Sequence, residues 1–477
     1  MPRVLFVASE CVPLIKTGGL ADVVGALPLA LAEQGCDTRV LIPAYRGLAA
    51  TLTAPKKVWS AKDLFGGPAA ILSGKVGALQ VMLLDAPHLY DRAGGPYSDA
   101  KGDFTDNAER FAALSWAAAE VAAKGLSDGW RPAILHCHDW QAGFAPAYLS
   151  AAKVTDVRSV MTIHNIAFQG HAPKAKLSAL RLPAADFHPD RLEFYGGLSS
   201  LKAGLVYADA ITTVSPTYAE ELMRPEFGMG LEGVIAARAS DLHGILNGID
   251  TDVWSPETDP EIVPYSARSL SEKRRNRRAL IEAFGLGSVP GPLVIIVSRM
   301  TSQKGLDLVP DMLDEFVWRG GGLAVLGSGD PALEAAFQAA AARNPRRIGV
   351  RIGYDEALSH RLFAGGDAVL IPSRFEPCGL TQLYGLRYGT LPVVAATGGL
   401  NDTVINASPL AIDGRAANGV TFFPTDGLAL AQAMRRLVAL YATKPLWRQM
   451  QRNAMKAALD WRPSSQAYHA LYQSLLT

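Results

Sequence analysis

Short apolar runs alternate with helix-forming stretches along most of this chain, and that alternation constrains its fold more than any other feature. Each run has the length and aliphatic content of a buried strand, and helical stretches such as 107–124 lie between several of them. The runs are 3–9, 38–43, 81–85, 134–138, 160–164, 211–214, 244–246, 293–297, 323–326, 349–352, 368–371, 391–394 and 420–423. Strands that alternate with helices predict βαβ units and mostly parallel sheets, which is an α/β fold.

Composition excludes several classes of partner. The chain has 477 residues, enough for two or three domains, and its formal net charge of +1 gives no field that would attract nucleic acid or an anionic membrane. No apolar run approaches the ~20 residues that a bilayer span needs, and the amino terminus lacks the pattern of a signal peptide. The four cysteines, Cys11, Cys36, Cys137 and Cys378, are widely spaced, as is typical of a reducing compartment. We therefore expect a cytoplasmic protein.

The first predicted strand leads into a glycine loop, 16–22 (Lys-Thr-Gly-Gly-Leu-Ala-Asp), which opens a helix. Strand, glycine loop and helix in this order are the first unit of a doubly wound sheet. The loop lacks both G-x-G-x-x-G and a Walker A pattern, which disfavours a dehydrogenase or an ATPase. Lys16 is either a solvated loop lysine or a cation beside backbone that a ligand can approach, and the loop alone leaves both readings open.

Two further strand ends carry polar side chains. His136 and His138 share one strand face, so a metal pair is conceivable, but no third ligand is evident nearby and we do not expect zinc. Asp139 follows as either a helix cap or a substrate ligand. His164 ends the next strand, where a lone histidine is more often structural than catalytic.

The segment 298–305 (Ser-Arg-Met-Thr-Ser-Gln-Lys-Gly) places two cations at the end of a predicted strand. Arg299 offers a planar fork of donors and Lys304 a point charge, so together they could clamp a diphosphate. The alternative is ordinary surface charge in a loop, which we consider less favoured because Arg299 adjoins a buried strand.

The segment 373–383 (Ser-Arg-Phe-Glu-Pro-Cys-Gly-Leu-Thr-Gln-Leu) joins the strand 368–371 to a helix. Open α/β sheets bind ligands at this end of their strands, and the free amides of Gly379, Leu380 and Thr381 would favour an anion. Glu376 cannot bind that anion, so we expect it to hold hydroxyls of a neutral group. The simpler interpretation is a helix with an acidic first turn.

Three other features are expected to be structural. Asp250 and Asp252 form a D-x-D that could hold a divalent cation, but they follow an Asn-Gly turn in a proline-containing stretch that we interpret as a linker. The basic run 273–278 is predicted to be the solvated face of one helix. The tail, 461–477, carries one apolar stripe and should pack on a domain.

An ordered set of motifs resembles the bacterial glycogen synthase family, which uses ADP-glucose and is related to plant starch synthases. The motifs are 16–22, 138–140 (His-Asp-Trp), 162–165 (Thr-Ile-His-Asn), 298–305, 376–380 (Glu-Pro-Cys-Gly-Leu) and 397–400 (Thr-Gly-Gly-Leu). The resemblance implies the GT-B architecture, in which two Rossmann-like, doubly wound domains face a deep cleft. It also implies retaining transfer of glucose from ADP-glucose to the non-reducing 4-hydroxyl of an α-1,4-glucan such as glycogen, with no metal and no cofactor.

The same resemblance implies a role for each matching residue. Arg299 and Lys304 would contact the diphosphate, Tyr354 the adenine, and Glu376 and Cys378 the glucose. The residues it marks as catalytic are Glu376, Arg299, Lys304, His164 and Asp139. Those it marks as substrate-binding are Lys16, Gly18, Gly19, Asp22, Asn247, Tyr354, Cys378, Gly379, Leu380 and Thr381.

The expected domains are 1–246, a linker 247–271, a nucleotide-sugar domain 272–456, and a helix 457–477 that crosses back to the first domain. We expect the domains to close about the linker when ADP and a glucan bind. Alternatives are a transferase that uses UDP-glucose on a small sugar, or a catalytically silent glucan-binding protein. A phosphorylase would need a cofactor lysine site that we do not find. The oligomeric state stays open.

Overall fold

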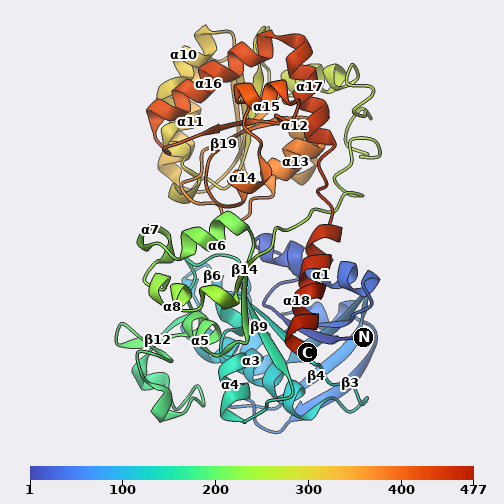
Figure 1. Ribbon diagram of the computed structural model, residues 1–477, viewed down its shortest axis with the longest axis vertical. Helices are drawn as coiled ribbons and strands as arrows, with labels where there is room; N and C mark the ends of the chain where they lie inside the picture. Colours follow the sequence, from blue (N-terminus) through green and yellow to red (C-terminus); the bar gives the residue numbers. More distant parts are fainter. The chain divides into compact units, whose positions relative to one another are not determined.

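The computed structural model describes residues 1–477, and the chain forms two compact units (Figure 1). The first comprises Met1–Asn247 and Trp461–Thr477, and the second comprises Gly248–Asp460. Of the segment 247–271, predicted to be a linker, residues 248–271 belong to the second unit, where Asp259 Oδ2 is hydrogen-bonded to His360 Nδ1 at 2.7 Å. None of the helices combines the length and apolar character that a membrane span requires.

The first unit is built on a nine-stranded mixed sheet. In spatial order the strands are β14 (Leu242–Gly244), β13 (Ala210–Thr213), β9 (Arg158–Ile163), β8 (Ile134–His138), β1 (Arg3–Val7), β2 (Asp37–Pro43), β5 (Leu79–Asp85), β4 (Ala69–Val76) and β3 (Thr53–Ala61). The strands from β14 to β5 are parallel, while β4 and β3 extend the edge as antiparallel strands. The order reverses between β1 and β8, and such a switch point is where doubly wound sheets bind ligands.

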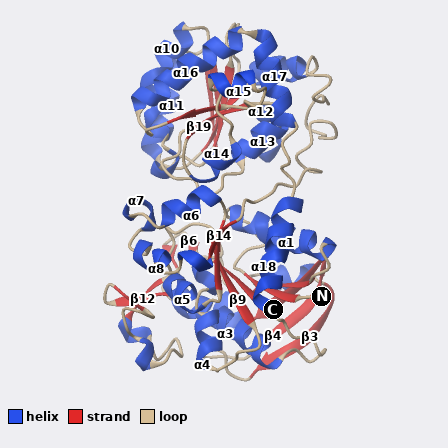
Figure 2. Cartoon of the chain, viewed as in Figure 1, coloured by secondary structure: helices blue, strands red, loops and turns tan.

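Helices cover this sheet on both faces (Figure 2). They are α1 (Gly19–Glu33), α2 (Pro87–Tyr90), α3 (Asn107–Lys124), α4 (Ala145–Ala151), α5 (Ser200–Tyr207), α6 (Pro216–Leu222), α7 (Pro225–Gly228), α8 (Glu232–Ala236) and α18 (Arg462–Leu476). Short antiparallel pairs lie in the loops: β6 (Ser98–Asp99) with β7 (Gly102–Asp103), and β12 (Gly197–Ser199) with β10 (His171–Pro173) and β11 (Glu193–Phe194). The carboxyl-terminal α18 lies beside α1, with Tyr468 and Tyr472 fully buried in the same core (Figure 1).

The second unit is built on a six-stranded parallel sheet with one core on each face. Its strands in spatial order are β17 (Ile348–Ile352), β16 (Gly322–Gly327), β15 (Leu293–Val297), β18 (Ala368–Ile371), β19 (Leu391–Ala395) and β20 (Val420–Phe422). Alternate residues of β15 show the two cores: Val294 and Ile296 lie in one, Leu293 and Ile295 in the other. Counted along the chain the order is 3-2-1-4-5-6, the Rossmann order, and it reverses between β15 and β18.

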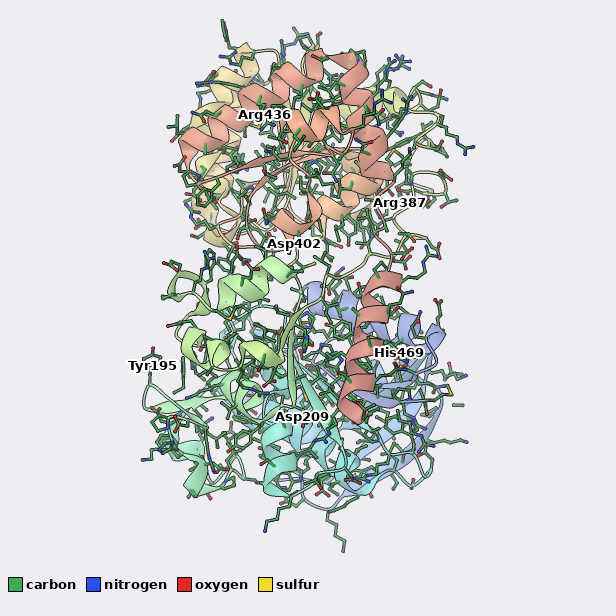
Figure 3. The ribbon with its side chains drawn as sticks, in the orientation of Figure 1. Tyr195, Asp209, Arg387, Asp402, Arg436 and His469 are labelled. Carbon is green, nitrogen blue, oxygen red and sulfur yellow. The ribbon has the colours of Figure 1, made fainter.

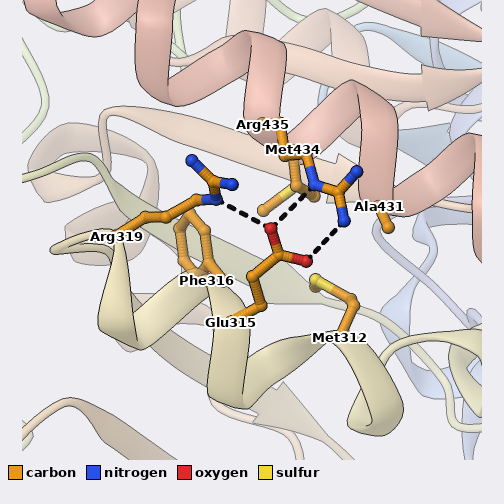
Figure 4. Close-up of a pocket in the computed structure, with 7 residues that line it drawn as sticks. All are labelled: Met312, Glu315, Phe316, Arg319, Ala431, Met434 and Arg435. Carbon is orange, nitrogen blue, oxygen red and sulfur yellow. Dashed lines mark hydrogen bonds and ion pairs between the residues drawn. The ribbon is translucent and has the colours of Figure 1, made fainter.

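The helices of the second unit are α9 (Lys273–Ala283), α10 (Leu313–Trp318), α11 (Pro331–Arg343), α12 (Glu356–Gly365), α13 (Thr381–Arg387), α14 (Gly398–Thr403), α15 (Pro409–Asp413), α16 (Gly427–Ala442) and α17 (Lys444–Met455). An ion-pair cluster joins two of them around a small cavity (Figure 4). Glu315 of α10 accepts two hydrogen bonds from Arg435 of α16, at 2.7 and 2.8 Å, and one from Arg319 at 2.8 Å. These guanidinium groups lower the pKa of Glu315 to about 2, so the cluster stays ionised at neutral pH.

The predicted α/β class and its parallel strands are confirmed, with two local differences. The last strand of the first series is β14 at Leu242–Gly244, two residues before its predicted place, and Ile245 still donates a hydrogen bond to Thr213 beyond it. The antiparallel β3–β4 pair has no counterpart among the predicted strands. Most of β3 is exposed and polar, so it lacks the apolar run by which a strand is found.

The prediction that the basic run 273–278 is a solvated face is wrong for two of its cations. Lys273 is buried, and its ammonium donates to the carbonyls of Phe363 and Ala364 at 3.0 and 2.9 Å. Burial lowers the pKa of Lys273 to about 7. Arg277 is ion-paired with Asp367 at 2.8 Å. The run therefore anchors α9 to the sheet, because these side chains reach inward between helix and strand ends.

Candidate active site

The carboxyl end of β1 carries the glycine loop at the switch point of the first unit. Lys16 Nζ lies 2.7 Å from Asp22 Oδ1, so these two predicted ligands form an ion pair at the start of α1. Gly19 is the first residue of that helix. A Cβ built on Gly18 would meet no atom within 4 Å, so packing does not require a glycine there. The bare backbone of Gly18 faces open space, which a ligand could enter.

Asp139 follows β8 on the other side of the same switch point. Its carboxylate is buried and accepts hydrogen bonds from the backbone N–H groups of His164, at 2.7 Å, and Asn165, at 3.4 Å. Burial, together with the nearby charge of Glu10, raises the pKa of Asp139 to about 7. Asp139 has a φ of 53°, an uncommon conformation for a residue other than glycine, and such strain concentrates at functional sites.

His164 is held in place by a second histidine. Its Nε2 lies 2.9 Å from Nδ1 of His138, and burial lowers the pKa of His164 to about 3, so the ring is neutral at physiological pH. Both nitrogens of His136 are also engaged, with Tyr472 at 2.7 Å and Thr162 at 2.6 Å. The histidines of β8 thus pair within the protein, and no group of three or more metal-ligating side chains occurs in the structure.

Two strand ends of the second unit are cross-linked at its switch point. Lys304, which follows β15, places its ammonium 2.6 Å from Oε2 of Glu376, which follows β18, and Ser373 donates to the same oxygen at 2.8 Å. The guanidinium of Arg374 makes a bidentate ion pair with Asp307, both contacts at 2.7 Å. The Lys304–Glu376 and Arg374–Asp307 ion pairs hold the two loops together, because each joins the β15 loop to the β18 loop.

The turn 376–381 rests on the two glycines that begin α14. A Cβ on Gly398 would lie 2.0 Å from the carbonyl oxygen of Glu376, and a Cβ on Gly399 2.1 Å from that of Cys378. Cys378 itself is buried, whereas Gly379, Leu380 and Thr381 remain partly accessible at the start of α13. The same Thr-Gly-Gly-Leu sequence occurs at 17–20 and at 397–400. The first copy follows the first strand of its sheet along the chain and the second follows the fifth, so the two segments do not occupy equivalent positions.

Three predicted site residues lie apart from these contacts. Arg299 is exposed and forms no ion pair. Tyr354 is 79% exposed after β17, and its hydroxyl donates to Glu356 at 2.9 Å. Asn247 is the last residue of the first unit, and its Oδ1 is buried with no hydrogen-bond partner. An unpaired buried acceptor is costly, so Asn247 remains a good candidate for a ligand contact.

Asp250 has a local structural task. Its Oδ1 accepts hydrogen bonds from the backbone N–H groups of Asp252 and Val253, at 2.9 and 3.1 Å. This arrangement closes a turn and needs no cation.

Sequence reasoning missed Glu10. The residue lies just beyond β1, is 3% exposed, and accepts hydrogen bonds from the glycine loop. The sequence could have indicated it. Open α/β sheets bind ligands at the carboxyl ends of their strands, and Glu10 follows the first strand as Asp139 and Glu376 follow later ones.

Comparison with known proteins identifies the family of the chain. A sequence model described as the starch synthase catalytic domain matches residues 3–237, and one described as glycosyl transferases group 1 matches 291–439. A glycogen synthase of Cereibacter sphaeroides (strain ATCC 17025) is 64% identical over 99% of this chain and 98% of its own. The chain belongs to the glycogen synthase family.

Other relatives agree. The glycogen synthase of Paracoccus denitrificans is 56% identical over the full length of both chains. The solved catalytic domain of starch synthase IV from Arabidopsis thaliana, bound to ADP and acarbose, is 32% identical, with a TM-score of 0.86 over 100% of this chain and 99% of that one. The resemblance inferred from the motifs is confirmed, and this glycogen synthase family member is a glycosyltransferase with the GT-B fold.

Proposed function

We propose that this enzyme transfers glucose from ADP-glucose to the non-reducing 4-hydroxyl of an α-1,4-glucan, with retention of anomeric configuration, and so elongates glycogen. The observation that carries the proposal is the second unit's switch point, where two cations, a buried carboxylate and a helix start follow neighbouring strands. Support also comes from the starch synthase relative, which binds ADP and the oligosaccharide acarbose.

The donor would bind on the second unit. Arg299 is free to reach a diphosphate, because no carboxylate holds it. Lys304 is fixed by Glu376, so its ammonium is already in place when a diphosphate arrives. Charge that develops on departing ADP is stabilised best by such preorganised donors. Glu376 would accept hydroxyls of the glucose, and Tyr354 would stack on the adenine.

The first unit would supply groups at the sugar. His164, neutral and fixed by His138, can exchange a hydrogen bond with a sugar hydroxyl without adding charge. Lys16, Asp22 and the open backbone of Gly18 would meet the donor phosphate or the acceptor. We propose that no metal and no cofactor takes part, because cationic side chains can neutralise the leaving group. EDTA should then leave activity intact, and loss restored by Mn²⁺ would overturn this point.

We propose that the enzyme works in the cytoplasm, which is supported by four cysteines that are all unpaired and buried.

A direct donor comparison tests the reaction. Radiolabelled ADP-glucose and UDP-glucose are offered in parallel, each with glycogen and with short maltodextrins. We expect label to enter glycogen faster from ADP-glucose. Equal rates from both donors, or transfer to a monosaccharide alone, would contradict the proposal and favour a UDP-glucose-dependent transferase.

A further inference from the structure

The glycine loop of the first unit is hydrogen-bonded to one buried carboxylate, that of Glu10. Glu10 Oε1 accepts a hydrogen bond from the Thr17 hydroxyl at 2.5 Å, and Oε2 accepts from the backbone N–H of Gly18 at 3.3 Å and from that of Thr17. Glu10 forms no ion pair, and Lys16, the nearest loop cation in sequence, is paired with Asp22 instead. The Glu10 carboxylate is therefore satisfied by the loop itself rather than by a counter-charge.

A tyrosine from a different loop completes this arrangement. The Tyr97 hydroxyl donates to Glu10 Oε1, and the hydroxyls of Tyr97 and Ser9 lie 2.7 Å apart. Burial and the Glu10 carboxylate both raise the pKa of Tyr97 far above its ordinary value, so the phenol keeps its proton and can donate. Glu10 thus receives hydrogen bonds from two segments that are far apart in sequence, one at Thr17 and Gly18 and the other at Tyr97.

Helix α3 fixes that tyrosine through the backbone around it. Arg110 is fully buried, and its guanidinium donates to the carbonyl of Pro96 at 2.9 Å and to Asn107 Oδ1 at 2.6 Å. Asn107 in turn donates to the carbonyl of Tyr97 at 2.9 Å. A continuous set of hydrogen bonds, most of them partly buried, runs from α3 through Tyr97 to Glu10 and ends at the glycine loop.

We propose that Glu10 is a positioning residue that holds residues 16–19 in one conformation for the nucleotide-sugar donor. This role rests on the proposed function, because it assumes that the loop contacts the donor. Glu10 is too deeply buried to touch a substrate, and its two carboxylate oxygens are engaged by Thr17, Gly18 and Tyr97. The loop would be ordered before the donor arrives, so that donor binding loses no free energy to the ordering of the loop.

Substitution of Glu10 should loosen the loop and weaken donor binding. In Glu10→Ala two backbone N–H groups and two hydroxyls lose their acceptor, so KM for ADP-glucose should rise roughly 10- to 100-fold while kcat falls much less. Glu10→Gln should restore most of the affinity. Its amide oxygen can face the two N–H groups, while its NH₂ group faces two hydroxyls that can also accept.

A matched control is Asp209→Asn, at the opposite end of the same sheet (Figure 3). Asp209 Oδ2 also accepts from one residue's backbone N–H and hydroxyl, those of Ser159 at 2.7 and 2.9 Å, but it lies before β13 rather than after a strand. This variant changes the same kind of carboxylate acceptor into an amide, as Glu10→Gln does, but away from the strand ends that carry the site. Its KM for ADP-glucose should match that of the wild type.

Hydrogen exchange of the free enzyme gives a second readout that needs no substrate. Peptides covering 12–22 should exchange faster in Glu10→Ala than in wild type, with Glu10→Gln between them and Asp209→Asn unchanged there. Unchanged exchange in this segment in both Glu10 variants would overturn the positioning role. Faster exchange with an unchanged KM would instead overturn the assignment of this loop to the donor, so the two failures are distinguishable. Should Glu10→Ala fail to fold, Glu10→Gln carries both measurements.

Discussion

Gly18 and Gly398 both stand at the start of a helix, but only one of them is required by packing. At Gly18 the backbone is extended, with φ −155°, and an added Cβ meets nothing. We predict that Gly18→Ala folds as stably as the wild type yet raises KM for ADP-glucose, because the methyl group fills space left for the ligand. Kinetics together with thermal unfolding make the test, and a wild-type KM would show that nothing approaches this loop closely.

Gly398→Ala is the structural counterpart. Gly398 has φ +44°, and its Cβ would lie 2.0 Å from the Glu376 carbonyl oxygen. The backbone strain alone costs about 1–3 kcal/mol, and the contact forces the 376–378 turn to move. We expect a lower unfolding temperature as well as lost activity, and an unchanged unfolding temperature would contradict this account of the turn.

Removal of Arg299 or of Lys304 should slow turnover to a similar degree, but the two substitutions should differ in their effect on the stability of the protein. Removal of one preorganised donor typically costs ~2.7–4 kcal/mol, or about 10²–10³ in kcat, and we expect that loss for both Arg299→Ala and Lys304→Ala. Only Lys304→Ala should also destabilise the protein, by at most about 3 kcal/mol, because it leaves the buried Glu376 carboxylate without its cation. Turnover near the wild-type value in either variant would refute the diphosphate clamp.

Asp139 should make stability fall as pH rises. Its folded-state pKa of about 7 lies above the ordinary value of 3.8, so between these pH values the folded protein holds a proton that the unfolded chain has released. Asp139→Asn removes this titration but keeps an oxygen for the His164 N–H. We expect the variant to gain stability relative to the wild type from pH 5 to pH 8, by at most about 1.4 kcal/mol per pH unit. Calorimetry at several pH values measures this difference, and a constant one would show that Asp139 is ionised throughout.

Residue patterns showed which side chains follow strand ends, but not which of them pair. Lys304 and Glu376 were both singled out, yet their contact at 2.6 Å depends on β15 and β18 being neighbours although 72 residues separate the two side chains. Sequence periodicity carries no information on strand order. Glu10 directly follows the predicted strand 3–9, so its position was visible in the sequence, but its contacts with the glycine loop and Tyr97 were not.

At the scale of elements, the strands that periodicity predicted are the ones with continuous apolar runs. Every strand of the second unit's sheet was predicted, since each contains apolar residues that lie in a core or pack against one. The exposed β3 and the two- and three-residue strands in the loops were not, because a short or polar strand leaves no pattern. Helix α18 was predicted from the apolar stripe along 461–477, but the sequence could not predict the hydrogen bond between Tyr472 and the sheet.

That hydrogen bond ties α18 to the centre of the first sheet. The Tyr472 hydroxyl pairs with His136, whose other nitrogen pairs with Thr162, and all three side chains are fully buried. Tyr472→Phe should therefore destabilise the protein by about 1–3 kcal/mol, since one ring nitrogen loses its partner. Tyr195→Phe is the control, because that ring is 82% exposed (Figure 3). Equal effects of the two substitutions on denaturant unfolding would argue against this anchor.

At the scale of the whole molecule, both units have the same design although their sequences differ. Each has a sheet with a parallel core and a switch point beside its first strand, and in each several of the predicted site residues follow the two strands at that point. Fold class and family could be inferred from the sequence because strand ends and motif order are local features. The roles of individual residues remain proposals, since they depend on where the substrates lie.

Nuclear magnetic resonance of the reaction itself tests the central claim most directly. The enzyme is incubated with ADP-glucose labelled with ¹³C at the anomeric carbon and with maltoheptaose, in the presence of EDTA, and the labelled carbon is followed over time. We predict a new α-1,4-linked terminal glucose on the glucan, formed in step with ADP. A β-linked product, or release of free glucose without chain extension, would contradict the account.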